Sequence, residues 1–176
     1  MLKYTGYIRK IRYYSESSHY IVALLEVEED QELLTMNGYM SNFNDYDKYV
    51  FYGDFEIHPK YGQQFKLDHY EIVLSTDEEE IIKYLSSPLF KGIGPTQAKY
   101  IVDALGENAL SLIKEDKHHL DLVKGMTVAK RELIYEVLTS NDYDQEVTQF
   151  FMGHGISLRH IGIIQETYKE KTLEIL

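Results

Sequence analysis

A ten-residue pattern recurs three times in the C-terminal part of this chain, and its spacing limits what that part can fold into. The copies are GIGPTQAKYI from Gly92, GMTVAKRELI from Gly125 and GISLRHIGII from Gly155, at intervals of 33 and 30 residues. Each copy carries an isoleucine nine positions after its first glycine. A period of about 30 residues is typical of repeated supersecondary units. The repeat therefore predicts an all-α part in which short helices flank each glycine turn.

The glycine turns suggest a way of binding a negatively charged ligand. Glycine adopts backbone angles that are closed to other residues, and it lets another molecule approach the main chain closely. The first N–H groups of a helix have no partner inside the helix, and together with the helix dipole they attract anions. Pro95 fits the first helical turn, where its missing N–H is not needed. The sequence therefore predicts that the turns bind phosphate oxygens of DNA without reading its base sequence.

The residues of the three turns are the candidate DNA contacts. A single Gly-x-Gly turn is more often only a tight corner, but three copies in register favour binding. We expect the first two turns to contact DNA, whereas the third can be structural. The candidates are Lys91, Gly92, Ile93, Gly94, Thr96 and Lys99 in the first turn, Lys124, Gly125, Thr127, Lys130 and Arg131 in the second, and Gly155, Ser157 and Arg159 in the third.

The N-terminal part follows a different pattern, which is typical of β-strands. Five runs rich in Tyr, Val, Ile and Phe are separated by segments with turn-forming residues. Five strands at this spacing are typical of a small barrel, and a five-stranded oligonucleotide-binding (OB) barrel is the natural candidate. We therefore predict an α+β chain, with an OB-like barrel over residues 1–76 and a helical region over residues 77–176. Thr76 or Asp77 can cap the first helix.

The first predicted strand is both basic and aromatic. Arg9 and Arg12 lie in it, and residues 1–14 contain no Asp or Glu. Strands of such barrels can stack bases on aromatic rings while cations follow the phosphate backbone. Tyr7, Arg9 and Arg12 are therefore candidate contacts of the barrel face, although tyrosine is also common in strands for packing reasons.

Composition restricts the partners. The chain has 18 Lys and Arg against 29 Asp and Glu, a net charge of −11, so any nucleic-acid site must be local and must rely partly on backbone groups. Cysteine is absent, which excludes disulfides and cysteine-ligated zinc and fits a reducing cytoplasm. No apolar run approaches the length of a membrane span, so we expect no membrane partner.

Catalytic and metal-binding patterns are weak. The acidic run 77–80 fits a helix N-terminus better than a metal site. The segment DYDQE from Asp142 has Val147 at the position where a calcium loop needs glycine. No serine lies in an activated turn. We therefore expect no catalytic residues, no metal and no cofactor in this chain.

Two longer segments resemble a known family. HPKYGQQFKLDHYE from His58 and YLSSPLFKGIGPTQAKYIVDALGENALSLI from Tyr84 are similar to the N-terminal region of bacterial RecD-like ATP-dependent DNA helicases. In that family an OB-type domain precedes tandem helix-hairpin-helix modules, and a superfamily 1 motor follows. The resemblance implies a parent helicase of 5′–3′ polarity in DNA repair or recombination, with ATP and magnesium in its motor domains and those domains as partners of this region.

The motor itself is not encoded in this sequence. A P-loop reads G-x-x-x-x-G-K-[ST], and Gln97 stands where its second glycine would follow Gly92. We therefore expect a non-catalytic fragment of a longer protein that binds DNA without hydrolysing ATP.

Other functions stay open. A Holliday-junction-binding protein also joins an OB barrel to tandem hairpins, although HPKYGQQF disfavours it. An acidic protein-interaction scaffold would use the glycine turns only as corners. An independent nuclease would cleave DNA with a metal, and no constellation of paired acids with a lysine supports it. A titration with DNA at several salt concentrations separates a DNA-binding chain from a scaffold.

Overall fold

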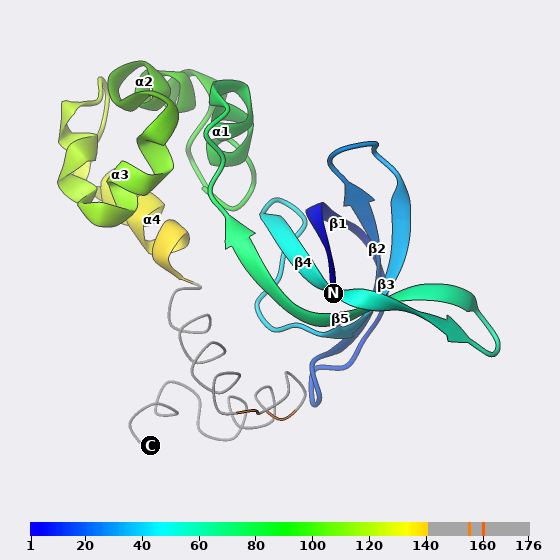
Figure 1. Cartoon of the computed structure of the whole chain (residues 1–176). Helices are drawn as coiled ribbons and strands as arrows, with labels where there is room; N and C mark the ends of the chain where they lie inside the picture. Colours follow the sequence, from blue (N-terminus) through cyan, green and yellow to red (C-terminus); the bar gives the residue numbers. More distant parts are fainter. Residues whose placement is uncertain (141–154, 156–159, 161–176) are drawn as a thin grey trace. The chain divides into compact units, whose positions relative to one another are not determined.

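The computed structural model describes residues 1–140 together with Gly155 and His160. These residues form an α+β chain in which a β-barrel precedes a set of helices, as the sequence predicts (Figure 1). The chain divides between Val73 and Leu74 into two compact units, the barrel and a helical unit. None of the helices in the described part combines the length and apolar character of a membrane span.

The N-terminal unit is a closed five-stranded barrel. Its strands are β1 (Leu2–Tyr14), β2 (Tyr20–Val27), β3 (Leu33–Tyr39), β4 (Lys48–His58) and β5 (Gly62–Val73). Their order around the barrel is β1-β2-β3-β5-β4, and pairing between β1 and β4 closes it. β3 and β5 run parallel, while the other neighbouring strands are antiparallel. The predicted OB-like barrel is confirmed.

Alternation of apolar residues explains the barrel core. Every second residue of β2 points inward, so that Ile21, Ala23 and Leu25 are buried. Phe51 from β4 and Phe65 from β5 are fully buried in the same cluster. Burying an apolar side chain of this size contributes about 1.5–3 kcal/mol.

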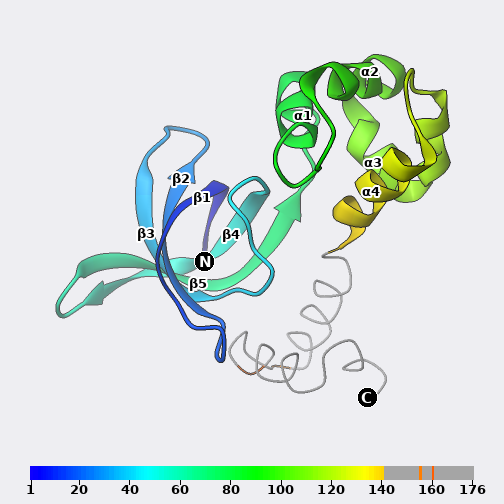
Figure 2. The same ribbon diagram turned by 180° about the vertical axis from the view of Figure 1, so that it is seen from behind.

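Bulges in strand β1 and a long β4–β5 hairpin shape one side of the barrel. The register between β1 and β2 skips Arg9 and Arg12, so each arginine lies at a β-bulge. β4 and β5 also continue past the barrel as a hairpin, paired as far as His58 and Gly62 (Figures 1 and 2). Bulges re-aim the side chains of a strand and increase its twist. Side chains from β1, β2 and the hairpin consequently surround one hollow.

The second unit is helical. It contains α1 (Glu78–Leu85), α2 (Pro95–Leu105), α3 (Ala109–Glu115) and α4 (Val128–Thr139), with short 3₁₀ segments η1 (Gly106–Asn108) and η2 (Lys117–Leu122). Asp77 caps α1 by accepting a hydrogen bond from the Glu80 N–H, as predicted. The repeat isoleucines Ile101 and Ile134 are fully buried in the core of this unit. The periodic isoleucine of the sequence is thus a packing position.

Candidate nucleic-acid interface

The first two glycine turns share one backbone hydrogen-bond pattern, displaced by 33 residues. The donor–acceptor pairs are Phe90 to Ser87, Ile93 to Phe90 and Ala98 to Gly94 in the first turn, and Val123 to Leu120, Met126 to Val123 and Arg131 to Thr127 in the second. Gly92 and Gly125 have φ of +85° and +78°, the left-handed region that favours glycine. The sequence repeat is therefore also a repeat of backbone structure.

The third turn lies mostly outside the described residues. Gly155 is exposed and has φ of +76°, like the first glycines of the other two turns. Ser157 and Arg159 fall outside the described part of the chain.

The two turns differ in how their helices begin. Gly94 is the N-cap of α2 and has no side chain to accept a hydrogen bond, whereas the Thr127 hydroxyl at the start of α4 accepts one from the Lys130 N–H at 3.2 Å. The N–H groups of Thr96 and Gln97 precede the first helical bond of α2, and they have no acceptor among the described residues. The start of α2 is therefore the more open anion site of the two.

Gln97 joins the two turns. Its Nε2 donates to the Lys124 carbonyl at 3.0 Å, and its Oε1 lies 3.5 Å from Lys130 Nζ. Gln97 and Lys130 are equivalent positions of the 33-residue repeat. A Cβ on Gly125 would lie 3.2 Å from Gln97 Oε1, so the second turn is packed against this side chain.

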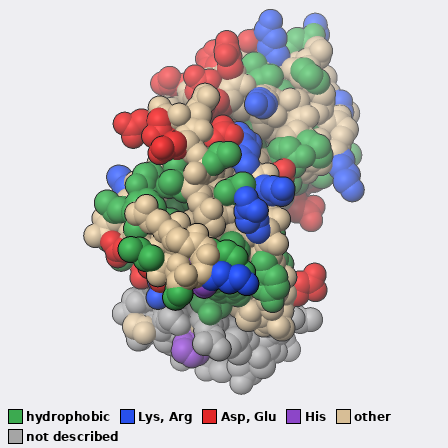
Figure 3. Space-filling model, turned by 90° about the vertical axis from the view of Figure 1, so that its right-hand side faces the viewer, with side chains coloured by type: hydrophobic (Ala, Val, Ile, Leu, Met, Phe, Trp, Pro, Cys, Tyr) green, Lys and Arg blue, Asp and Glu red, His purple; other side chains and the backbone are tan. Residues whose placement is uncertain are grey.

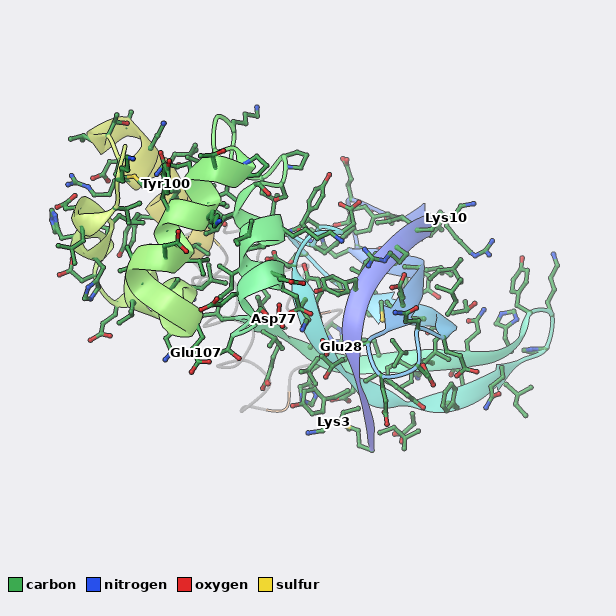
Figure 4. All side chains as sticks on the ribbon, turned by 90° about the horizontal axis from the view of Figure 1, so that it is seen from above. Lys3, Lys10, Glu28, Asp77, Tyr100 and Glu107 are labelled. Carbon is green, nitrogen blue, oxygen red and sulfur yellow. The ribbon has the colours of Figure 1, made fainter. Side chains whose placement is uncertain are left out.

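The central residue of each of these two turns packs into the helical core. Ile93 is buried in the helical core and Met126 packs against it. The lysines around the first turn are outside that core: Lys91 and Lys99 are exposed, and neither forms an ion pair within the described part of the chain. Lys124 Nζ lies 5.2 Å from the ring centre of Tyr100, a residue of α2 that is labelled in Figure 4.

Arg131 has a different environment from the other cations of the second turn. Its guanidinium donates to Asp121 at 2.9 Å and to Glu132 at 3.0 Å, and its side chain is only 15% exposed. Hydrogen bonds from His118 and Arg131 lower the pKa of Asp121, and hydrogen bonds from Lys117 and Arg131 lower the pKa of Glu132. Arg131 thus joins η2 to α4, and its charge is already matched by two carboxylates.

A second candidate surface is a groove on the barrel, with a volume of about 600 Å³. Its walls come from β1, β2, β3 and the β4–β5 hairpin, and they contain no Asp or Glu: Arg12, Tyr13, Tyr20, Val22, Thr35, His58, Tyr61 and Gln64. Hydrophobic and basic side chains lie next to one another on the side of the barrel from which the hairpin extends (Figure 3).

The two arginines of β1 have separate roles. Arg12 lines the groove and is exposed, with no ion pair among the described residues. Arg9 donates to Glu26 at 2.8 Å and lies over the Tyr7 ring at 4.7 Å, outside the groove. The hydrogen bond to Glu26 raises the pKa of Arg9. Of the three predicted barrel contacts, the structure brings only Arg12 to the groove.

The family comparison identifies the barrel. Residues 1–75 match the family model of the OB-fold domain of the ATP-dependent DNA helicase YrrC. This OB-fold domain contains all of the strands described above, since β5 ends at Val73. The resemblance of the N-terminal part to an OB-type domain of a DNA helicase is confirmed over these residues.

The groove of this OB-fold domain contains residues that the sequence analysis did not select. Tyr13, Tyr20, His58, Tyr61 and Gln64 line it, although they come from segments far apart in the chain. The signal that could have pointed to them is the turn HPKYGQQ, which holds His58, Tyr61 and Gln64 within seven residues. Strands β2 and β3 and the loop between β4 and β5 are the parts of OB folds that commonly bind oligonucleotides.

No group of three or more His, Asp or Glu residues in the described part of the chain is arranged to hold a metal ion. The two candidate surfaces described above contain amides, rings, hydroxyls and a few cations.

Proposed function

We propose that this chain is a non-catalytic DNA-binding N-terminal region of a RecD-like ATP-dependent DNA helicase. In this proposal the two glycine turns are helix-hairpin-helix modules that bind the phosphate backbone of DNA, whatever its base sequence. The match of residues 1–75 to a helicase OB-fold domain supports the helicase assignment. The repeated turns in the following unit support the mode of binding.

The observation that carries the proposal is the open start of α2. Gly92 directs the chain through a left-handed turn, and Gly94 leaves the first amides of the helix without a side-chain cap. An anion is the ligand that this helix start favours. It is attracted by the two free N–H groups and the helix dipole, and the exposed Lys91 and Lys99 add positive charge nearby. A site of this kind tolerates the net charge of −11 because few of its contacts depend on long-range attraction.

In this proposal, ATP hydrolysis and DNA unwinding belong to other parts of the parent protein. Motor domains outside this sequence would bind ATP and magnesium and move along DNA, and this region would hold DNA beside them. In this proposal such a helicase acts in DNA repair or recombination in the bacterial cytoplasm with 5′–3′ polarity, which the resemblance of the sequence supports.

A charged cap at Gly94 tests the proposal. Gly94 has φ of −92° and ψ of 175°, which any residue adopts, and a Cβ there meets nothing within 4 Å. In the variant Gly94→Asp the new carboxylate would accept from the free amides of α2 and repel phosphate, while it stabilises the helix by about a few tenths of a kcal/mol relative to glycine. We expect affinity for a short blunt duplex, measured by fluorescence anisotropy at low salt, to fall about tenfold or more while the melting temperature stays equal or rises.

The matched control places the same charge elsewhere. Asn108 is the exposed N-cap of α3 and has φ of −97° and ψ of 19°, so the variant Asn108→Asp adds one negative charge at another helix start of the same unit without backbone strain. Duplex affinity that is unchanged in Gly94→Asp overturns the phosphate role of α2. A chain that binds no duplex even at low salt overturns the DNA-binding proposal and favours the scaffold.

A further inference from the structure

We propose that the Gln97 side chain is a positioning residue that aligns the two glycine turns, so that both bind one DNA duplex at the same time. This inference rests on the proposed DNA-binding function and adds to it the residue on which simultaneous binding depends. The backbone of Gln97 supplies one of the free N–H groups of α2, whereas the inference concerns its side chain alone. The two contributions can therefore be tested separately.

The Gln97 side chain binds the second turn instead of its own helix start. Gln97 is the third residue of α2, a position from which a glutamine commonly bonds back to the N–H of the N-cap residue. Its Nε2 donates instead to the Lys124 carbonyl at 3.0 Å, 27 positions along the chain. The start of α2 consequently stays open, and the helix is tied to the second turn.

The partners of Gln97 fix the orientation of its amide group. The Lys124 carbonyl can only accept, so it faces the NH₂ group, and the Lys130 ammonium can only donate, so it faces Oε1 at 3.5 Å. A flipped amide would place acceptor against acceptor and donor against donor. Gln97 is half-buried, and a Cβ on Gly125 would lie 3.2 Å from its Oε1. The side chain is therefore held between the second turn and α4.

Tyr100, which is labelled in Figure 4, makes a second contact between α2 and the same lysine. Residues 97 and 100 lie three positions apart, which places them on one face of a helix. The Lys124 ammonium lies 5.2 Å from the centre of the Tyr100 ring, while the Lys124 carbonyl is bound by Gln97. The equivalent lysine of the first turn, Lys91, is exposed and has no such contact within the described part of the chain. The link between the turns thus runs from α2 to the second turn.

A fixed spacing between the turns raises the affinity for a ligand that contacts both of them. Phosphates lie at regular intervals along a stiff duplex. When one turn has bound a phosphate, the other meets its own phosphate at an effective concentration that depends on how closely its position is constrained. Loosening the link lowers this concentration and leaves each turn able to bind alone. Inorganic phosphate gains nothing from the link, because it occupies one turn at a time.

The test removes the side-chain contacts of Gln97 and keeps its length. In the variant Gln97→Met the backbone N–H remains, and both hydrogen-bonding groups of the side chain are lost. We expect the affinity of the whole 176-residue chain for the short blunt duplex, measured by fluorescence anisotropy at low salt, to fall about tenfold. The melting temperature should change little, because the side chain is half-buried and lies outside the helical core.

The matched control makes the same substitution in the barrel. Gln63 is exposed on β5, so Gln63→Met should leave both the duplex affinity and the melting temperature unchanged.

A second probe separates alignment of the turns from damage to the start of α2. Inorganic phosphate is titrated into the ¹⁵N-labelled chain, and the shift of the Thr96 amide resonance gives its dissociation constant. Gln97→Met and the wild type should give the same constant, although their duplex affinities differ. A purely structural effect on α2 would weaken the binding of phosphate and of duplex together.

The outcomes separate this inference from the proposed function. Equal duplex affinity in Gln97→Met and the wild type overturns the inference, and the anion site of α2 is then still judged by Gly94→Asp. A parallel loss of phosphate and duplex affinity also overturns it, because the effect then lies within α2. Weaker duplex binding with phosphate binding retained supports it. A wild-type Thr96 amide that does not respond to phosphate overturns the anion site itself and the inference with it.

Discussion

The barrel groove and the first glycine turn offer different chemistry to a ligand. The groove presents rings and side-chain donors from three strands and a hairpin, whereas the turn presents two backbone amides beside exposed lysines. Side chains that stack require unpaired bases, and amides at a helix start require only a phosphate. Under the proposed function, an acidic chain would thus have two local surfaces for DNA, one suited to the phosphates of any form of it and one suited to unpaired bases.

The two surfaces should be separable by unfolding one unit. Phe65 is fully buried in the barrel, and Phe65→Ala should cost about 3–5 kcal/mol, a large part of the stability of a small domain. We expect loss of oligothymidine binding and of one unfolding transition in urea, with duplex binding retained. Loss of duplex binding together with oligothymidine binding would show that the two surfaces depend on each other.

The backbone conformation of the first turn can be tested at Gly92. A side chain in the left-handed region costs about 1–2 kcal/mol, so Gly92→Ala should lower stability by that amount and weaken duplex binding severalfold. Gly106 also has a positive φ and open space around it, so Gly106→Ala should cost at least as much stability. Duplex affinity, measured by anisotropy, should fall only in the first variant. An equal fall in both variants would mean that binding follows stability rather than the turn.

The two bulge arginines provide a finer comparison within the barrel. Arg12→Gln should reduce the slope of log affinity against log salt for oligothymidine by about 0.7, because one phosphate contact is lost. Arg9→Gln should leave that slope unchanged, since its guanidinium is bound to Glu26. Anisotropy titrations at four or more salt concentrations measure both slopes. Equal slopes in the two variants would remove Arg12 from the interface.

The smallest effect concerns Arg131 and pH. The pKa values of Asp121 and Glu132 are lowered in the folded chain, so their ion pairs stabilise it above the ordinary carboxyl pKa values of 3.8 and 4.5. That contribution is lost as the pH falls through the lowered pKa values. Thermal unfolding from pH 6 to pH 3 should show a shallower loss of stability in Arg131→Ala, with duplex affinity at neutral pH nearly unchanged. A strong loss of duplex affinity would return Arg131 to the interface.

The sequence predicts most of the fold because its signals are local. The alternation of Ile21, Ala23 and Leu25 marks β2, and Asp77 marks the start of α1. The interval of 33 residues between Gly92 and Gly125 predicts two equivalent turns, and both glycines adopt a positive φ. Each of these features depends on neighbouring residues and a period, which a sequence displays directly.

The groove depends on features that a sequence does not display. Tyr13 and Tyr61 belong to distant segments, and only the closure of the barrel brings them to one groove. Arg9 and Arg12 look equivalent, but the partner of each is set by two bulges in the β1–β2 register. Arg131 likewise looks available until η2 brings Asp121 to its guanidinium. Pairing register and ion pairs between elements thus decide which candidate residues are free.

The amide resonances of Thr96 and Gln97 test the central claim most directly. A ¹H–¹⁵N correlation spectrum of the labelled chain, recorded as duplex DNA is added, reports whether these two N–H groups receive phosphate. The account predicts that both resonances shift strongly and saturate with the dissociation constant found by anisotropy. Unchanged resonances for both amides at saturating duplex would contradict it.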